Sequence, residues 1–275
     1  MSASTITVAI PSGGVWLPAW TLCQRELVRF FRQRDRIASA FATPLLFWLV
    51  IGSGMGRSFL SPSWFGGTGY LQYLFPGSIA MVLLFTAIFS TISVIEDRRE
   101  GFLQSVLVAP VAPSGIVIGK LAGGAMIATL QAVLFLLVAP MAGISLGVGH
   151  VLATAIVAFL VAFGLTGLGF LLAWRLDSVQ GFHAVMNLLL MPMWMLSGAL
   201  FPASGAAGWL RVVMRCNPLT YGVGALQHAM GLGEMTGDGA ASSFWMALGA
   251  TALFAGLMLW ASVAIVRRPR KQYEA

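Results

Sequence analysis

Residues 150–174 have the sequence HVLATAIVAFLVAFGLTGLGFLLAW. These 25 residues include no Asp, Glu, Lys or Arg. At a rise of about 1.5 Å per residue, a helix of this length crosses the ~30 Å hydrocarbon core of a bilayer. The sequence therefore predicts a transmembrane helix here.

Five further stretches share this length and apolar character, and they are residues 37–59, 70–95, 114–141, 182–201 and 244–266. Of the whole chain, 58% is hydrophobic and only 9% is charged, whereas about 25% is charged in ordinary soluble domains. One soluble core cannot bury so much apolar surface, so the bilayer must act as part of the solvent. We predict an all-α polytopic membrane protein with six transmembrane helices, in a single transmembrane domain covering residues 1–275.

The basic residues are distributed asymmetrically about these spans. Thirteen of the 16 Lys and Arg fall on one side, and only Arg57, Arg211 and Arg215 fall on the other. Basic residues concentrate in cytoplasmic loops, so both termini are predicted to be cytoplasmic, in a multi-pass protein of the cell (inner or plasma) membrane. This asymmetry also accounts for the net charge of +7. The expected partner of the charge is anionic lipid, and no nucleic acid is expected.

Residues 15–36 precede the first span and have an amphipathic helical pattern. Apolar residues recur at three- and four-residue steps on one face, and arginines recur on another, namely Arg25, Arg29, Arg32 and Arg36. Such a pattern predicts a helix lying in the cytoplasmic interface. An ordinary soluble helix is the alternative.

The link between the second and third spans begins with Glu96-Asp97-Arg98-Arg99-Glu100-Gly101 and continues as a short apolar ridge to residue 108. Pro110 and Pro113 end this ridge. We predict a short cytoplasmic helix over residues 96–108 that presents its surface to a partner. A solvated turn that only anchors the topology is the alternative.

Residues 202–230 follow the fifth span and are largely apolar, but Pro and Gly interrupt them. Neither half is long enough to cross a membrane, so we predict two short helices in the outer interface, half-embedded or re-entrant. Pro192 should kink the fifth span.

Several kinds of chemistry are excluded by the same residues. The middles of the six spans hold no Asp, Glu, Lys or Arg, which argues against ion-coupled transport. Lys120 lies near enough to the cytoplasmic face to snorkel outward. The segment 114–121, SGIVIGKL, lacks the first Gly and the final hydroxyl of a phosphate-binding loop. We expect no catalytic residue, no metal site and no cofactor in this chain, hence no enzymatic activity.

Two motifs resemble those of the type-two ABC permeases, the membrane subunits of bacterial ABC exporters. The first comprises Glu96, Arg99-Glu100-Gly101, Leu103, Leu107 and Pro110, and the second comprises Leu196-Ser197-Gly198, Phe201-Pro202 and Asn217-Pro218-Leu219-Thr220-Tyr221. The resemblance covers residues 20–270. This chain departs from the family at Phe102 and Gln104, where the family often has Thr and Glu.

The resemblance implies that residues 96–108 are a coupling helix seated on a separate ABC ATP-binding subunit, which would bind ATP and magnesium. The coupling residues would be Glu96, Arg98, Arg99, Glu100, Gly101, Phe102, Leu103, Val106 and Leu107. Residues 15–36 would be the connecting helix, with Arg25, Glu26, Arg29 and Arg32 beside the same subunit. Two permease copies, as a homodimer or a heterodimer, would enclose a path between them. The candidate path residues are Phe85, Thr86, Phe89, Asn187, Met191 and Met195, for which ordinary helix packing is the alternative.

The sequence thus favours a permease of the drug-efflux-like branch, which exports a hydrophobic or amphipathic compound such as a drug, an antibiotic or a lipid-like molecule. Export of a lipid-linked glycan is an alternative within the family. A non-transporting assembly or regulatory component with the same fold, or a secondary transporter, is an alternative outside it. Stimulation of a partner's ATP hydrolysis would distinguish a permease from both of these.

Overall fold

A computed structural model of the chain describes residues 14–32, 34–55, 69–108, 111–233 and 243–267. Within these ranges, the side chains outside the description are those of residues 34–41, 55, 104 and 107–108. Some predicted features therefore lie outside the described residues, namely Arg57, Pro110, the residues after Arg267 and the side chains of Arg36, Gln104 and Leu107.

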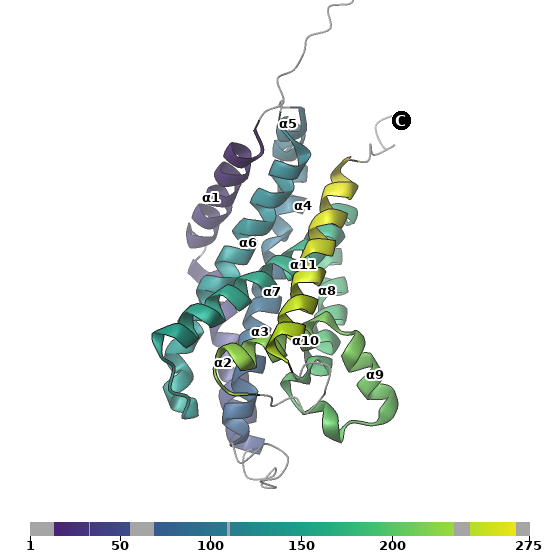
Figure 1. Ribbon diagram of the computed structural model, residues 1–275. Coiled ribbons are helices and arrows are strands. Elements are labelled where there is room, and N and C mark those ends of the chain that lie inside the picture. The colour runs from purple at the N-terminus through teal and green to yellow at the C-terminus, as the bar shows by residue number, and fades with distance from the viewer. Residues whose placement is uncertain (1–13, 33, 56–68, 109–110, 234–242, 268–275) are drawn as a thin grey trace, which may run out of the picture.

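The described residues form helices and no β-strand (Figure 1). The helices are α1 (Trp16–Arg32), α2 (Arg34–Met55), α3 (Tyr70–Ser90), α4 (Ile92–Arg99), α5 (Phe102–Val108), α6 (Pro113–Phe135), η1 (Leu136–Ala142), α7 (Val148–Arg175), α8 (Val179–Trp194), η2 (Met195–Ala199), η3 (Ala203–Gly205), α9 (Gly208–Cys216), α10 (Pro218–Ala229) and α11 (Phe244–Arg267).

Five of the predicted spans are present as helices long and apolar enough to cross a membrane. They are Tyr70–Arg99, Pro113–Ala142, Val148–Arg175, Val179–Ala199 and Phe244–Arg267. The first predicted span, 37–59, falls on α2, whose described apolar part is the shorter Ala42–Gly54. The chain is therefore an all-helical membrane protein, and its six-span count stays a prediction.

The α3 helix lies at the centre of the bundle, and α11 lies at its edge. Sixteen of the 21 residues of α3 are buried, because α2, α6, α7, α8 and α10 surround it. By contrast, α11 buries one narrow stripe and exposes large side chains such as Trp245 (76% exposed) and Trp260 (72% exposed). A helix apolar on all sides belongs in a core, and exposed apolar faces on a membrane helix meet lipid.

The α1 helix is held against α6 by a stripe of glycines. Gly115, Gly119 and Gly123 recur every fourth residue of α6 and face α1. A Cβ atom at Gly119 would lie 2.6 Å from the carbonyl oxygen of Ala19, closer than packing allows. Small residues at this spacing let two helix backbones approach closely. The glycines of the segment 114–121 therefore have a packing role, and α1 is a packed helix whose outer face exposes Trp16 and Trp20.

The fifth span ends in a break of the helix, and hydrogen bonds with α3 hold this break in place. Within η2, Leu196 and Gly198 leave helical geometry, the latter with φ = 79°. The Tyr73 hydroxyl donates to the Gly198 carbonyl (2.6 Å), and the Trp194 indole N–H donates to the Gly77 carbonyl (2.7 Å). Backbone carbonyls freed by a helix break in a membrane need such donors. The break thus occurs at the Leu-Ser-Gly motif rather than at Pro192, where α8 continues for two more residues.

Beyond this break, α9 and α10 occupy the segment 202–230. The α10 helix is almost entirely buried, whereas α9 buries only Met214. The Asn217 side chain caps α10 and ties its start to α8, since its oxygen accepts from the Leu219 N–H (3.0 Å) and its amide donates to the Met193 carbonyl (2.6 Å). Two short helices, α9 and α10, lie in this segment, and a half-embedded or re-entrant position in the membrane stays a prediction.

Candidate coupling site and adjoining cavity

The segment predicted as one coupling helix consists of the last turn of α4, a tight turn and α5. The α4 helix ends at Arg99, and Gly101 has φ = 77°, a left-handed conformation that favours glycine. The α5 helix then begins at Phe102 and buries Leu103 (4% exposed). Glu100 is exposed at the turn. In Figure 1, α5 lies at the same end of the bundle as α1 and the end of α11.

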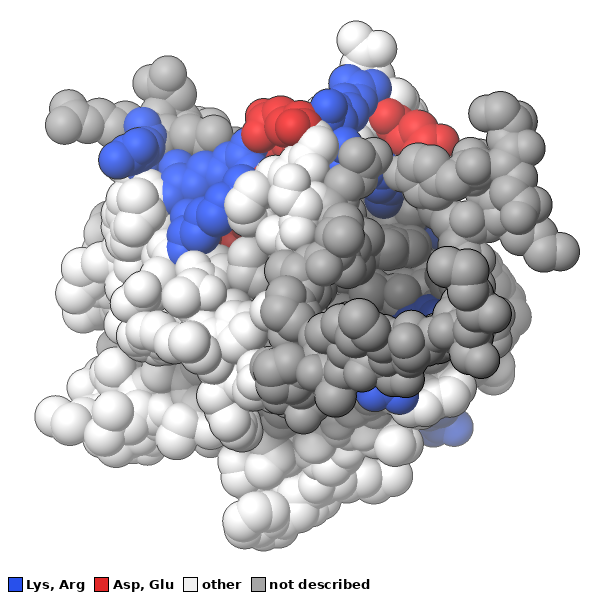
Figure 2. Space-filling model, turned by 90° about the horizontal axis from the view of Figure 1, so that it is seen from above, with Lys and Arg blue, Asp and Glu red and all other residues white. Residues whose placement is uncertain are grey.

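Charged side chains of both signs gather at this end. Figure 2, which views the molecule from that end, shows basic and acidic atoms side by side among otherwise uncharged atoms. The reason is a set of ion pairs between α1, α4 and α6, which are separated in sequence and adjacent in space.

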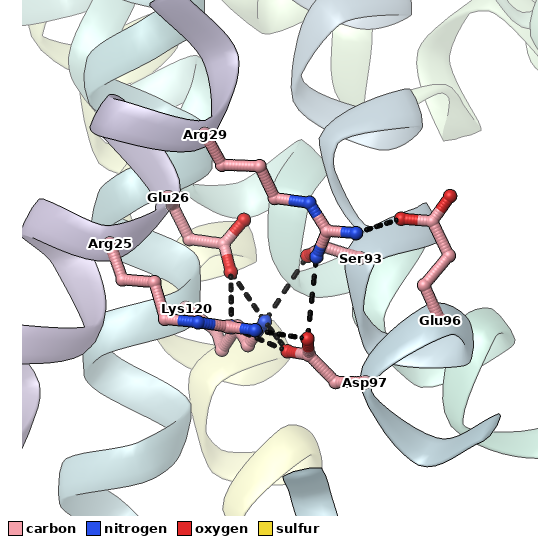
Figure 3. A network of polar contacts seen from close by, with 7 residues as sticks. All are labelled: Arg25, Glu26, Arg29, Ser93, Glu96, Asp97 and Lys120. Atoms are coloured by element: carbon pink, nitrogen blue, oxygen red, sulfur yellow. Dashed lines mark hydrogen bonds and ion pairs between the residues drawn. The ribbon is translucent and has the colours of Figure 1, made fainter. Parts of the chain in front are cut away.

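Asp97 lies at the centre of these pairs and is fully buried (Figure 3). Its carboxylate accepts two hydrogen bonds from the Arg25 guanidinium, of 2.9 and 2.6 Å, and one of 3.3 Å from Arg29. The Lys120 ammonium also contacts this carboxylate. A bidentate pair with arginine is among the strongest side-chain interactions in proteins.

Lys120 extends the network to Glu26 and Ser93. Its ammonium pairs with the Glu26 carboxylate and donates to the Ser93 hydroxyl at 3.2 Å. Only 5% of Lys120 is exposed. The expectation that Lys120 snorkels to the surface is therefore wrong, because buried carboxylates from α1 and α4 supply its partners.

The cluster is balanced in charge. Three cations face three carboxylates, and the residues are Arg25, Arg29, Lys120, Glu26, Glu96 and Asp97. A buried charge is tolerated when it is paired and hydrogen-bonded, and loss of one partner is costly. Hydrogen bonding with Asp97 also raises the pKa of the Arg25 guanidinium above its ordinary value. Arg25, Glu26 and Arg29, expected beside an ATP-binding subunit, thus bond within the chain to α4 and α6.

A second set of contacts joins residues 98–101, called the coupling turn below, to the loop between α7 and α8. The Arg98 guanidinium donates to the carbonyls of Ala173 (3.1 Å) and Trp174 (2.8 Å) and pairs with Asp177 (3.0 Å). Arg99 donates to the Asp177 carbonyl at 2.9 Å. These arginines donate hydrogen bonds to carbonyls that are left unpaired at the end of α7, where positive charge is favoured. Arg98 and Arg99 therefore fix the turn to the bundle.

Phe102 and Val106 complete the coupling segment. The Arg25 guanidinium lies 3.9 Å from the centre of the Phe102 ring, a cation–π contact between α1 and α5. Val106 is half-buried. Arg32 is exposed at the end of α1, outside these contacts.

A cavity of about 530 Å³ adjoins the ion cluster. Its lining is contributed by α1, α2, α3, α4, α6 and α8, and the lining residues include Glu26, Arg29, Phe85, Phe89, Glu96 and Met191. Beyond its far end, the rings of Phe47 on α2 and Trp194 on α8 meet at a centroid distance of 5.2 Å. The cavity therefore runs from the charged end into the apolar part of the bundle.

The candidate path residues divide into two groups. Phe85, Thr86, Phe89 and Met191 line the cavity. Asn187 and Met195 are exposed on α8 and η2 and do not line it. The Thr86 hydroxyl donates to the side-chain oxygen of Gln131 on α6, so its position is set by a polar contact inside the bundle.

Sequence reasoning missed Asp97, Lys120 and Ser93 as a group. The signal available was that Lys120 and Glu26 are charged residues within apolar surroundings, a combination that usually indicates a partner. Which partner each takes depends on helix packing, and no spacing along the chain reveals it. Among the described residues, no group of His, Cys, Asp or Glu is placed to hold a metal ion.

Residues 19–230 match the family of ABC-2 type transporter membrane proteins. The chain belongs to this family. An ABC-2 permease is a membrane subunit, and the family implies an ABC ATP-binding partner. The Glu96–Gly101 turn and the Leu-Ser-Gly break lie inside the matched region.

Three relatives illustrate the range of ABC-2 proteins that this chain resembles. The putative transport permease ycf38 of Cyanophora paradoxa is 26% identical over 207 residues, which cover 74% of this chain and 70% of that protein. Nodulation protein J of Rhizobium leguminosarum bv. trifolii is 25% identical over 274 residues, 98% of each chain. The probable multidrug ABC transporter permease YbhR of Escherichia coli (strain K12) is 26% identical over 153 residues, 55% of this chain and 42% of that protein. This ABC-2 permease is therefore similar to proteins named as transport permeases and to a nodulation protein.

Proposed function

We propose that this chain is the membrane-spanning permease subunit of an ATP-driven exporter and moves a hydrophobic or amphipathic compound out of the cytoplasm. Drugs, antibiotics and lipid-like molecules are the cargo classes that fit a permease of this composition. Family membership supports the transport role. The observation that carries the proposal is that charged side chains join the coupling turn to α1, α6 and α7.

The proposed mechanism is a rigid-body push on that turn. A partner ATP-binding subunit would contact the surface around Glu100 and α5. Asp97 is bonded to Arg25 and Lys120, so a displacement of α4 would carry α1 and α6 with it. Arg98 would carry the α7–α8 loop in the same way. The cavity between these helices would change shape as they move.

The proposed working unit contains two permease copies and two ATP-binding subunits, with ATP and magnesium on the latter. The apolar face of α8 is exposed in the single chain, with Leu188 at 79% and Val185 at 40%. A second copy across a two-fold axis would face this surface along the export path. In this arrangement both termini and the coupling turn lie in the cytoplasm.

The test is reconstitution with an ABC ATP-binding protein encoded beside this chain. The permease should stimulate ATP hydrolysis by that protein, and Glu100→Lys or Gly101→Val should abolish both the stimulation and export. Membrane insertion should be unchanged, because neither residue is part of a span's apolar face. Gly256→Val is a matched control, since nothing lies within 4 Å of a Cβ at that position. Normal export by the Gly101→Val variant would refute the coupling role.

The predicted orientation has its own test. Cys216 is exposed on α9, and Cys23 is buried on α1 at the opposite end. A maleimide that does not cross membranes should label Cys216 in intact cells and leave Cys23 unlabelled. Labelling of the coupling turn from outside, through Ser105→Cys, would reverse the proposed topology.

A further inference from the structure

The cavity beside the ion cluster has an asymmetric charge pattern at its polar end. Its charged lining groups, within the described residues, are two carboxylates, Glu26 and Glu96, and one guanidinium, Arg29. Arg25 and Lys120 belong to the cluster and pair with Asp97 and Glu26, and neither lines the cavity. Because Lys120 already pairs with Glu26, Glu96 is the lining carboxylate that remains open to an occupant.

We infer that this cavity binds an amphipathic organic cation, with the charged group at Glu96 and the apolar part along Phe85, Phe89 and Met191. The inference rests on the proposed function, because it names the class of cargo that the permease would take from the cytoplasmic side.

Glu96 is the carboxylate that can accept a further partner. Its side chain is 34% exposed, and one of its oxygens accepts a 2.7 Å hydrogen bond from Arg29. Its other oxygen points away from Arg29 (Figure 3). A carboxylate offers about four lone-pair sites, so a cationic group can bind Glu96 while the bond to Arg29 persists.

An anionic group would meet the opposite situation. Arg29 is the one Lys or Arg among the described lining residues, and both Glu96 and Asp97 accept hydrogen bonds from it. An anion would have to displace Glu96 from Arg29 or share Arg29 with Asp97, and in either case it would lie beside like charge, which is unfavourable. The carboxylates at this end therefore favour a cation over an anion.

The lining beyond the charged end suits the apolar part of the same molecule. Phe30, Phe85 and Phe89 contribute aromatic rings, whose faces attract cations and contact apolar groups. The rings of Phe85 and Phe89 lie 5.9 Å apart, and Met81 and Met191 add flexible side chains that adapt to different shapes. The volume of about 530 Å³ falls in the usual range for sites of drug-sized ligands.

Binding of two probes to the purified chain in lipid nanodiscs tests this inference. Tetraphenylphosphonium and tetraphenylborate share four phenyl groups and differ in the sign of their charge. Equilibrium dialysis against empty nanodiscs corrects for partition into lipid. The wild-type chain should bind the phosphonium with higher affinity than the borate, and Glu96→Gln should weaken phosphonium binding by about tenfold, since one charge-assisted contact is lost.

Three further variants test separately the negative charge at Glu96, the aromatic ring at Phe89 and a carboxylate outside the cavity. Glu96→Asp should restore most of the affinity, and Phe89→Leu should weaken binding by about threefold through loss of a cation–π contact. Glu100→Gln removes an exposed carboxylate that does not line the cavity, and without the partner ATP-binding subunit this variant should bind the phosphonium as the wild type does. Equal binding of the two probes would overturn the inference. So would equal phosphonium affinity in the Glu96→Gln and Glu100→Gln variants.

The same preparations, assayed for stimulation of the partner's ATP hydrolysis, distinguish the two proposals. Stimulation without selective phosphonium binding would overturn the cation site and leave the transport role intact. Selective binding without stimulation would support the site and refute the coupled transporter.

Discussion

The two ends of the helix bundle are held together by different kinds of interaction. At the end that carries the coupling turn, which is predicted to be cytoplasmic and is called the cytoplasmic end below, Asp97 binds Arg25 and Lys120 in a buried ion cluster. At the opposite end, predicted to face outward and called the outer end below, the hydroxyl of Tyr73 and the indole N–H of Trp194 donate to backbone carbonyls at a helix break. One end therefore depends on paired charges, and the other depends on neutral hydrogen bonds.

From this difference we expect the helices at the charged end to move together and the hydrogen bonds at the other end to break more easily. Separating a buried ion pair leaves uncompensated charge, so the helices that share such pairs stay together. Neutral hydrogen bonds in membrane proteins contribute roughly 0.6 kcal/mol each on average, and they can break one at a time. A push at the cytoplasmic end would thus be transmitted as a unit, and the break at η2 would respond.

The largest effect is expected from Asp97→Ala. The change leaves Arg25 and Lys120 without their central partner, which should cost about 3–5 kcal/mol of folding stability. Thermal unfolding of the purified chain in detergent measures the loss. Glu100→Ala, at an exposed position of the same segment, should leave the unfolding midpoint nearly unchanged. Equal midpoints for the two variants would show that the cluster does not hold this end together.

Arg98→Ala should have the next largest effect. It removes hydrogen bonds to Ala173, Trp174 and Asp177, each charge-assisted, and should free the coupling turn from α7. We expect stimulation of the partner's ATP hydrolysis to fall by about tenfold, which corresponds to 1.4 kcal/mol of coupling. Arg98→Lys keeps the charge but loses the planar guanidinium. Its stimulation of ATP hydrolysis should lie between that of the wild type and that of the alanine variant. Full stimulation in the alanine variant would assign Arg98 to stability alone.

A smaller effect is expected where α1 meets α6. In Gly119→Val, new side-chain atoms would overlap the backbone of Ala19, and such overpacking costs about 1–3 kcal/mol. Detachment of α1 should expose Cys23, which is 3% exposed and whose thiol pKa is raised by burial. The rate of maleimide labelling at Cys23 measures this directly, with Gly256→Val as the matched control. An unchanged labelling rate would mean that the charge pairs alone hold α1.

Some of these features could be predicted from the sequence. The long apolar segments gave five helices whose bounds lie within a few residues of the predicted ranges, because membrane spans need length and lack charge. The segment 96–108, predicted as one helix, is instead divided by a turn at Gly101, whose φ is 77°.

Other features depend on which helices meet, and that information lies outside local patterns. The stripe Gly115, Gly119, Gly123 is visible in the sequence, and two of its glycines lie in the segment 114–121, but the helix that packs on it cannot be read from the spacing. The pair Asp97–Lys120 joins two helices 23 residues apart, and the direction of each side chain follows from helix packing. For the same reason, Arg98 was assigned to the partner surface, although its guanidinium turns back to α7.

The smallest effect is expected at the outer end, from Tyr73→Phe. This change removes the 2.6 Å bond to the Gly198 carbonyl and leaves the ring in place. The free energy of unfolding should fall by about 1 kcal/mol, since a buried carbonyl loses its donor. Tyr221→Phe is the matched control, because its hydroxyl donates to the Arg215 carbonyl at an exposed position, where water can replace it. If both variants lose the same free energy of unfolding, burial of the Tyr73 hydrogen bond adds nothing to the stability of the outer end. If Tyr73→Phe costs as much as Asp97→Ala, the two ends are held with equal strength, and the pinned break at η2 is no weaker than the ion cluster.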